Sequence, residues 1–261
     1  IYWGYYEHND PQRRVHHTEI IGNLFERCPQ NASSGTGYGI QLKSGNHDNL
    51  IEDNVLVDVG GTTRAGIIVY HNAPKPVGSD LAGTNIIRGN LVIRSRNEGI
   101  NASAGALIEN NIVIDAASIA IYLQPRSYGG ATYYGSLQVR NNTVYQTTAG
   151  DGIRFTHENW SLADPARPTE FTGNLSIVTG GGDGLRPPSD SATVAQNATN
   201  GNDNGAAGTI AISATDVVSL TFGDQSFLYP TSGGPLVDAG VAPAASIDFN
   251  GISRDRNPDV G

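Results

Sequence analysis

The chain has 261 residues, with 33 glycines, 13 prolines, no methionine and a formal net charge of −9. Its 38% apolar and 16% charged residues suffice for a narrow core and not for a thick globular one. The single cysteine, Cys28, excludes an internal disulfide, and the lack of any lysine or arginine run disfavours a nucleic-acid partner.

A phrase made of alternating apolar residues, an asparagine and a second alternating run recurs along the chain. It occupies 20–25, 50–56, 86–92, 107–113, 138–144 and 170–176. Its asparagines lie 31, 36, 21, 31 and 32 positions apart, at Asn23, Asn54, Asn90, Asn111, Asn142 and Asn174. A repeat of this size indicates a solenoid in which each repeat forms one coil.

A second phrase, a glycine or alanine followed by an alternating run, lies between these asparagines. It occupies 39–43, 66–70, 99–103, 120–124 and 152–156. Alternation with period two is typical of strands, so each coil holds at least two short strands and no helical segment. Stacking equivalent strands aligns their buried residues in columns, such as Ile40, Ile67, Ile100, Ile121, Ile153 and Leu185. The sequence therefore predicts an all-β protein, a parallel β-helix.

The repeated asparagines are interpreted as structural residues and not as catalytic ones. Asparagine tolerates the left-handed conformation that a sharp corner between two sheets requires. Its side-chain amide can also hydrogen-bond to the asparagine of the next coil, about 4.8 Å away at the spacing of neighbouring strands. We therefore expect a ladder of asparagine side chains along one corner of the solenoid.

Over about residues 1–190 these repeats resemble the right-handed parallel β-helix superfamily, which includes pectate-lyase-like and chondroitinase-like enzymes. The resemblance implies the right-handed sense, which the periodicity alone does not give. The segment 234–240 and the residues after 248 look like the closing segment of secreted bacterial β-helix proteins. We therefore expect coils over 1–190 and a coil and capping segment of the same domain over 191–261.

The sequence also gives expectations for the cellular location and the oligomeric state of the protein. No apolar run approaches the roughly 20 residues of a membrane span, and no signal peptide opens the sequence. The first residues, 1–3, read as the middle of a coil, so the chain is interpreted as a mature or trimmed fragment. We expect a monomer that acts in the extracellular or periplasmic space after bacterial-type secretion.

Two outward-facing columns of side chains follow from stacking the second phrase. One column contains Gln41, Ile68, Asn101, Tyr122, Arg154 and Arg186, and the other contains Lys43, Tyr70, Ser103, Gln124 and Thr156. His71, Arg126 and His157 come just after, at long insertions that we expect to wall a groove. Amides, guanidinium groups and tyrosines suit a polymer of sugars. The predicted substrate-binding residues are Gln41, Asn101, Tyr122, Gln124, Arg126, Arg154 and His157.

The run Lys43-Ser44-Gly45-Asn46, followed one coil later by Tyr70-His71, resembles a motif pair of the alginate lyase and chondroitinase B family. In that family the lysine acts as base and an arginine as acid. Here the asparagine stands one place early, Tyr70 stands where the arginine would be, and His71 matches the family's histidine. The resemblance implies a lyase with Lys43 as the base and Tyr70 or His71 as the acid. The alternative interpretation is that Lys43 and Tyr70 are ordinary solvent-facing residues.

Two other functional classes stay open at this point. A glycoside hydrolase would use paired carboxylates, and Glu98, Asp151 and Asp183 each precede the glycine of a coil, although aspartate is also a common turn residue there. A non-catalytic glycan-binding or surface module would use the same columns. The cofactor is not determined, because Asp48, Asp53 and Asp58 are too scattered to predict a calcium site.

Overall fold

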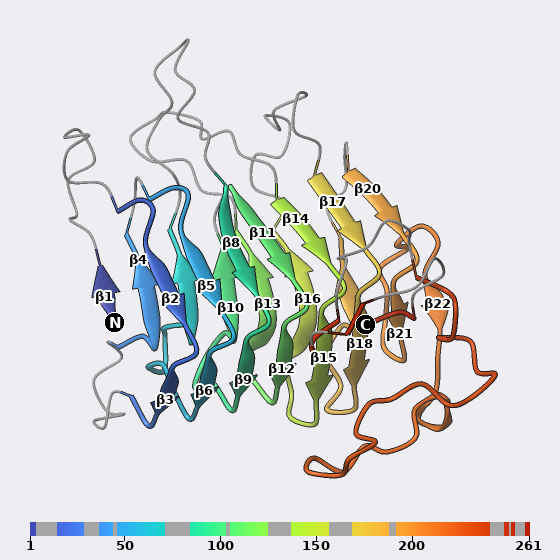
Figure 1. Ribbon diagram of the computed structural model, residues 1–261. Helices are drawn as coiled ribbons and strands as arrows, with labels where there is room; N and C mark the ends of the chain where they lie inside the picture. Colours follow the sequence, from blue (N-terminus) through green and yellow to red (C-terminus); the bar gives the residue numbers. More distant parts are fainter. Residues whose placement is uncertain are drawn as a thin grey trace.

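The computed structural model describes residues 1–3, 15–28, 37–43, 46–70, 84–102, 105–124, 137–156, 169–187, 192–240, 248–250, 252–253 and 259–261. These residues form a stack of coils with three strands in each coil (Figure 1). Every strand pairs in parallel with its equivalents in the coils before and after it. The predicted parallel β-helix is therefore confirmed, with three sheets that run along the whole stack.

The first sheet contains β1 (Tyr2–Trp3), β4 (Ile40–Leu42), β7 (Ile67–Val69), β10 (Ile100–Ala102), β13 (Ile119–Leu123), β16 (Asp151–Phe155) and β19 (Leu185–Arg186). The second sheet contains β2 (Glu19–Ile21), β5 (Leu50–Glu52), β8 (Asn85–Arg88), β11 (Ala106–Glu109), β14 (Leu137–Arg140), β17 (Thr169–Thr172) and β20 (Ala192–Ala195). The third contains β3 (Leu24–Glu26), β6 (Val55–Val57), β9 (Leu91–Ile93), β12 (Ile112–Ile114), β15 (Thr143–Gln146), β18 (Leu175–Val178), β21 (Ala198–Thr199) and β22 (Ile210–Ala211).

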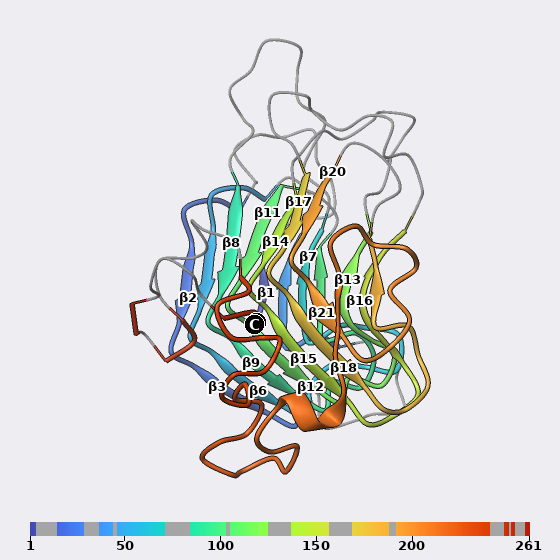
Figure 2. The ribbon, with the colours of Figure 1, turned by 90° about the vertical axis from the view of Figure 1, so that its right-hand side faces the viewer.

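Aliphatic side chains between the three sheets form a narrow core. Figure 2 views the stack of strands from its C-terminal end. The predicted column is confirmed, because each of its members is fully buried on the inner face of the first sheet: Ile40, Ile67, Ile100, Ile121, Ile153 and Leu185. Towards the C-terminal coils the channel holds larger rings, and Phe155 meets Phe171 edge to face at 5.6 Å. One residue per strand in register thus supplies a continuous apolar interior.

The asparagine ladder is confirmed at the corner between the second and third sheets. Each Nδ2 donates to the Oδ1 of the next asparagine at 2.9–3.0 Å through six successive bonds. Each Oδ1 also accepts the backbone N–H of the asparagine in the preceding coil at 3.0–3.1 Å. The ladder includes a seventh member, Asn197, which the sequence repeat did not reveal. It fixes the register of neighbouring coils.

The expected left-handed conformation lies one residue earlier than predicted. None of the ladder asparagines has a positive φ, whereas the residue before each of them does: Gly22, Asp53, Gly89, Asn110, Asn141, Gly173 and Gln196. The preceding residue makes the sharp bend at the end of the second-sheet strand. The asparagine is then free to direct both its backbone N–H and its side chain along the stack.

Regular strands continue beyond residue 190, since β20, β21 and β22 extend the second and third sheets. After them the chain forms a short 3-10 helix, Ala214–Asp216, and folds back along the outer face of the third sheet (Figure 2). There Val217, Leu228, Leu236 and Val260 are buried together with outer-face residues of the sheet: Ile93, Ile114, Tyr145, Leu175 and Ile177. The division of the chain at residue 190 stays a prediction. In the part of the chain that the structure describes, no helix is long and apolar enough to cross a membrane.

Replacing Asn111 by alanine should destabilise the fold by about 1–3 kcal/mol, because it leaves buried hydrogen-bonding groups without partners. The Nδ2 of Asn111 bonds to Asn142 and to the Ile87 carbonyl oxygen, and its Oδ1 accepts from Asn90. Equilibrium unfolding in denaturant would measure the loss. Asn23→Ala, at the exposed end of the same ladder, is the matched control and should cost less. Equal stability of Asn111→Ala and the parent protein would contradict a structural role for the ladder.

Candidate functional site

The outer faces of the three sheets differ in what occupies them. On the second sheet, charged residues of neighbouring coils form ion pairs, with Arg88 bonded to Glu52 and Arg140 to Glu109. On the third sheet, the C-terminal segment covers apolar side chains. The outer face of the first sheet carries an open pocket. The candidate site is therefore on the first sheet, where the sequence places the two polar columns.

The register of the first outward column is confirmed by strand pairing. Gln41, Ile68, Asn101, Tyr122, Arg154 and Arg186 lie opposite one another on successive strands. Their exposure differs from the expected solvent-facing column, however. Gln41 has no exposed surface and Asn101 is 5% exposed, whereas Tyr122, Arg154 and Arg186 are half-buried. The N-terminal members of this column are therefore buried and the C-terminal members partly exposed.

The second column follows the ends of the same strands. Backbone bonds place Tyr70 beside the end of β4, through its N–H to the Leu42 carbonyl oxygen at 3.0 Å, and Gln124 beside β10 in the same way. The buried Asn46 side chain donates to the carbonyl oxygens of Lys43 and Tyr70 and holds these two ends together. Asn46, part of the motif that resembles the lyase family, is thus a structural brace. Ser44, His71, Ser103, Arg126 and His157 lie outside the described residues.

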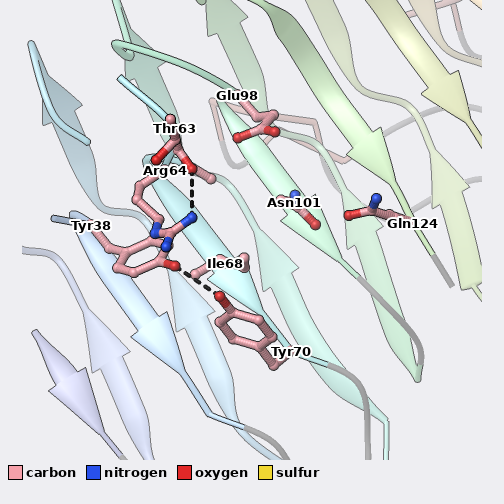
Figure 3. Close-up of a pocket in the computed structure, with 9 residues that line it drawn as sticks. Tyr38, Thr63, Arg64, Ile68, Tyr70, Glu98, Asn101 and Gln124 are labelled. Atoms are coloured by element: carbon pink, nitrogen blue, oxygen red, sulfur yellow. Dashed lines mark hydrogen bonds between the residues drawn. The ribbon is translucent and has the colours of Figure 1, made fainter. Parts of the chain in front are cut away.

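The pocket lies over strands β7, β10 and β13 (Figure 3). Its lining combines phenol, amide, carboxylate and guanidinium groups: Tyr38, Thr63, Arg64, Ala65, Ile68, Tyr70, Glu98, Asn101 and Gln124. Three of the predicted site residues, Tyr70, Asn101 and Gln124, are brought together here. Tyr38 and Arg64 were not predicted, and Glu98 was considered only as a carboxylate of the hydrolase alternative.

Two tyrosines from adjacent coils form the centre of the site. The hydroxyl oxygens of Tyr38 and Tyr70 are 2.8 Å apart, and their rings meet edge to face (Figure 3). A cation lies against each ring: Lys43 Nζ is 5.2 Å from the centroid of Tyr70, and Arg64 Cζ is 5.7 Å from that of Tyr38. Both distances lie within the range of cation–π attraction. The order Arg64, Tyr38, Tyr70, Lys43 is therefore a continuous chain of contacts across the first sheet.

The electrostatics of this chain favour a protonated Tyr38. Burial of its hydroxyl, followed by the hydrogen bond with Tyr70, raises the pKa of Tyr38 far above its ordinary value of 10. Near neutral pH the Tyr38 phenol is thus a proton donor in hydrogen bonds and not a base.

Asn101 presents a buried acceptor in the pocket. Its Oδ1 is buried without a hydrogen-bond partner among the described residues. A desolvated acceptor of this kind costs about 1–3 kcal/mol, which a ligand hydroxyl would recover. The pocket therefore combines hydrogen-bond donors, acceptors and cations in the way that a sugar residue requires.

The carboxylates of the hydrolase alternative have structural partners. Asp151 and Asp183 are on adjacent coils, as predicted, and Asp151 Oδ1 accepts the backbone N–H of Asp183 at 3.0 Å. The other oxygen of Asp151 bonds to Arg154 at 3.1 Å, and Asp183 Oδ1 accepts from Asn202 at 2.8 Å. These contacts fit the interpretation of both residues as turn aspartates. Arg154 is thereby held by Asp151, beyond the edge of the pocket.

No cluster of three or more His, Cys, Asp or Glu side chains with metal-binding geometry occurs among the described residues. Of the three scattered aspartates, Asp48 pairs with His47 and Asp58 with Arg94. Burial, followed by the charge of the neighbouring Glu52, raises the pKa of Asp53 above its usual value despite the opposing charge of Arg88. Asp48, Asp53 and Asp58 are all left-handed corner residues.

Comparison with known proteins identifies the class of fold. No family model matches the chain, and no curated protein matches it in sequence. Among solved structures, the chain is similar to a right-handed parallel β-helix, the crystal structure of pectate lyase Pel9A. The TM-score is 0.51 at 15% sequence identity, over 95% of this chain and 60% of that one. The fold is thus the right-handed parallel β-helix that the resemblance implied, and this chain corresponds to 60% of the length of that structure.

The Tyr70→Phe substitution should lower the pKa of Tyr38, because it removes the hydrogen bond that favours the neutral phenol. Titration of tyrosine absorbance against pH would measure the change. Tyr145→Phe is the control, since burial and Asp115 also raise the pKa of Tyr145, at a different sheet. An unchanged Tyr38 titration in Tyr70→Phe would contradict the pairing.

The raised pKa of Tyr38 also makes the free energy of unfolding depend on pH. Above about pH 10 the unfolded chain loses this proton while the folded chain keeps it. The stabilising contribution is therefore complete below pH 10 and is lost as the pH rises towards the folded-state pKa. Tyr38→Phe should make the decline of unfolding free energy above pH 10 shallower.

Proposed function

We propose that the protein is a polysaccharide lyase that cleaves an acidic glycan by β-elimination. The observation that carries the proposal is the contact chain Arg64, Tyr38, Tyr70, Lys43 on the outer face of the first sheet. It places a cation, Arg64, and an amine, Lys43, beside two phenols, and elimination from a uronate needs a partner for the carboxylate, a base and an acid. The likeness of the fold to a pectate lyase supports the same class of reaction. We further propose that the protein acts on this polymer outside the cell, as a monomer.

In the proposed reaction each of the four side chains has a separate role. The Lys43 amine removes the proton at C5 of the uronate, and the electrons of that C–H bond form the new C4–C5 double bond. The C4–O bond breaks, and the leaving oxygen takes the proton of Tyr70. Arg64 pairs with the substrate carboxylate and stabilises the negative charge that develops next to C5.

Tyr38 has a positioning role in this scheme. Because its own proton is firmly held, its hydroxyl donates to Tyr70 as that oxygen becomes negative. The ammonium of Lys43 lies against the Tyr70 ring and would favour the same phenolate. The proton removed by Lys43 then returns to Tyr70 and restores both groups. In the motif of the alginate lyase and chondroitinase B family an arginine stands at the position of Tyr70. In this chain Arg64, in the turn before β7, supplies the cation instead.

The remaining predicted residues are assigned to binding. Asn101, Gln124 and Tyr122 would contact sugar hydroxyls and ring faces over the middle of the first sheet, and Arg154 would bind a neighbouring acidic sugar. Gln41 is left out of the proposal because it has no exposed surface. His71, Arg126 and His157 stay predictions.

Lys43→Met should preserve the fold and lower turnover by about a hundredfold or more, because it removes the base and keeps the aliphatic stem. The assay incubates the protein with alginate, pectate, chondroitin and neutral glycans and follows ultraviolet absorbance of the unsaturated product. Arg27→Met, an exposed cation beside the third sheet, is the control and should keep full turnover. Substrate binding should weaken far less than turnover. Near-normal turnover of Lys43→Met on a confirmed substrate would contradict the assignment.

The same assay separates the two alternative functions. A hydrolase releases reducing ends without the new absorbance, and a binding module releases neither product. The double variant Asp151→Asn, Asp183→Asn abolishes activity under the hydrolase alternative alone, because only that mechanism needs both carboxylates. We expect this variant to retain ultraviolet-absorbing product formation.

A further inference from the structure

The pocket on the first sheet has two chemically different walls. The wall nearer the N-terminal coils carries the phenols and a guanidinium group: Tyr38, Arg64 and Tyr70 (Figure 3). The wall nearer the C-terminal coils carries hydrogen-bond acceptors: Glu98, Asn101 and Gln124. The proposed elimination takes its acid and its carboxylate partner from the first wall, whereas Glu98 has no role in it.

The strand register explains why a space opens between the two walls. Tyr38, Ala65 and Glu98 each stand two positions before a buried isoleucine of β4, β7 or β10. These isoleucines are register partners on adjacent strands: Ile40, Ile67 and Ile100. Because neighbouring strands are about 4.8 Å apart, the strands that carry Tyr38 and Glu98 are about 10 Å apart. Between them the equivalent position has only the methyl group of Ala65, which leaves room for a ligand.

Glu98 brings negative charge into this space. Its carboxylate accepts a hydrogen bond from Asn97 Nδ2 at 2.6 Å, which fixes its orientation. Burial and the hydrogen bond with Tyr70 raise the pKa of Tyr38, and the charge of Glu98 adds to this effect while that of Arg64 opposes it. The carboxylate therefore acts on the same space as the phenol pair. An anionic group of a ligand placed against Glu98 would be repelled.

The amides beside Glu98 add acceptors to the same wall. Asn101 is 5% exposed, and its Oδ1 has no hydrogen-bond partner among the described residues. A half-turn of the amide exchanges Oδ1 and Nδ2 with no other change of shape, so the acceptor can face a ligand. Gln124, which follows β13, extends its amide towards Asn101 (Figure 3). Acceptors held away from water need donors, and the donors of a sugar are its hydroxyl groups.

A uronate can meet both walls at the same time. Its carboxylate is attached to C5, and its C2 and C3 hydroxyls lie across the ring from that carbon. With the carboxylate at Arg64, as the proposed reaction requires, the two hydroxyls face Glu98 and Asn101. One sugar ring thus spans the pocket, with its anion against the cation and its donors against the acceptors.

We infer, on the basis of the proposed function, that the pocket selects a uronate whose C2 and C3 hydroxyls are free, with Glu98 as the specificity-determining residue. An O-acetyl group removes a donor and leaves an acceptor of the pocket without a partner. An O-sulfate group does the same and also places a negative charge against Glu98. The substrate class is therefore an unsubstituted polyuronate, and O-acetylated or O-sulfated polymers are rejected.

The test measures binding by calorimetry to the Lys43→Met variant, in which turnover is slowed. The probes are oligomers of mannuronate, of galacturonate and of unsulfated chondroitin, each with free hydroxyls and as its O-acetylated and O-sulfated derivatives. The free oligomer that binds best should bind about tenfold or more tightly than either of its derivatives, because only the free form supplies both donors. This comparison needs no change in the pocket wall itself.

Glu98→Gln in the same variant identifies the residue responsible. Glutamine keeps the shape and one acceptor, removes the charge and adds a donor that a sulfate can accept. The preference for the free over the sulfated oligomer should fall by about tenfold. Glu19→Gln, an exposed carboxylate on the second sheet, is the matched control and should leave the preference unchanged. Circular dichroism checks that each variant is folded.

Three results would overturn the inference: equal affinity for free and substituted oligomers, binding of none of the oligomers, or a preference that Glu98→Gln leaves unchanged. The proposed function is judged separately, by ultraviolet absorbance with the parent protein. A preference for free oligomers without unsaturated product would support the inference and contradict the lyase. Equal product formation from free and sulfated polymers would support the lyase and overturn the inference.

Discussion

The asparagine ladder is the interaction on which the rest of the structure depends. A parallel sheet of two- to five-residue strands has few bonds per strand to define its register, and a slip of one residue would exchange its inner and outer faces. The ladder prevents this slip, because each asparagine is bonded to the next coil through both its side chain and its backbone N–H. A polar side chain can be buried at this corner because its hydrogen bonds are satisfied within the stack.

A fixed register turns distant sequence positions into neighbours on the outer face. Lys43 and Tyr70 meet because their strands are adjacent, and the buried Asn46 amide bonds to both of their carbonyl oxygens. Tyr38 and Arg64 then reach this pair from segments that precede β4 and β7. Cation–π attraction then holds Lys43 against the ring of Tyr70 and Arg64 against the ring of Tyr38. The same stacking of coils places the His16 ring of one coil on the His47 ring of the next.

The elements that repeat were predictable from the sequence, and the elements that do not repeat were not. The buried column from Ile40 to Leu185 and the ladder could be predicted because each coil contributes one equivalent residue. The contact of Tyr38 with Tyr70 could not, since one residue precedes its strand, the other follows its strand, and only the side-chain directions bring them together. The burial of Gln41 does not follow from the alternation, which places its side chain on the outer face. Asn197 follows a strand of small residues, Ala192–Ala195, with weak alternation.

The central claim is that a stack held in register by asparagines presents one sugar-binding surface, on the first sheet. The most direct measurement is a crystal structure of the Lys43→Met variant with an acidic oligosaccharide bound. We expect sugar rings over β4, β7 and β10, with a carboxylate near Arg64 and a glycosidic oxygen near the hydroxyl of Tyr70. Sugar density on the outer face of the second or third sheet, with none over the first, would contradict the claim.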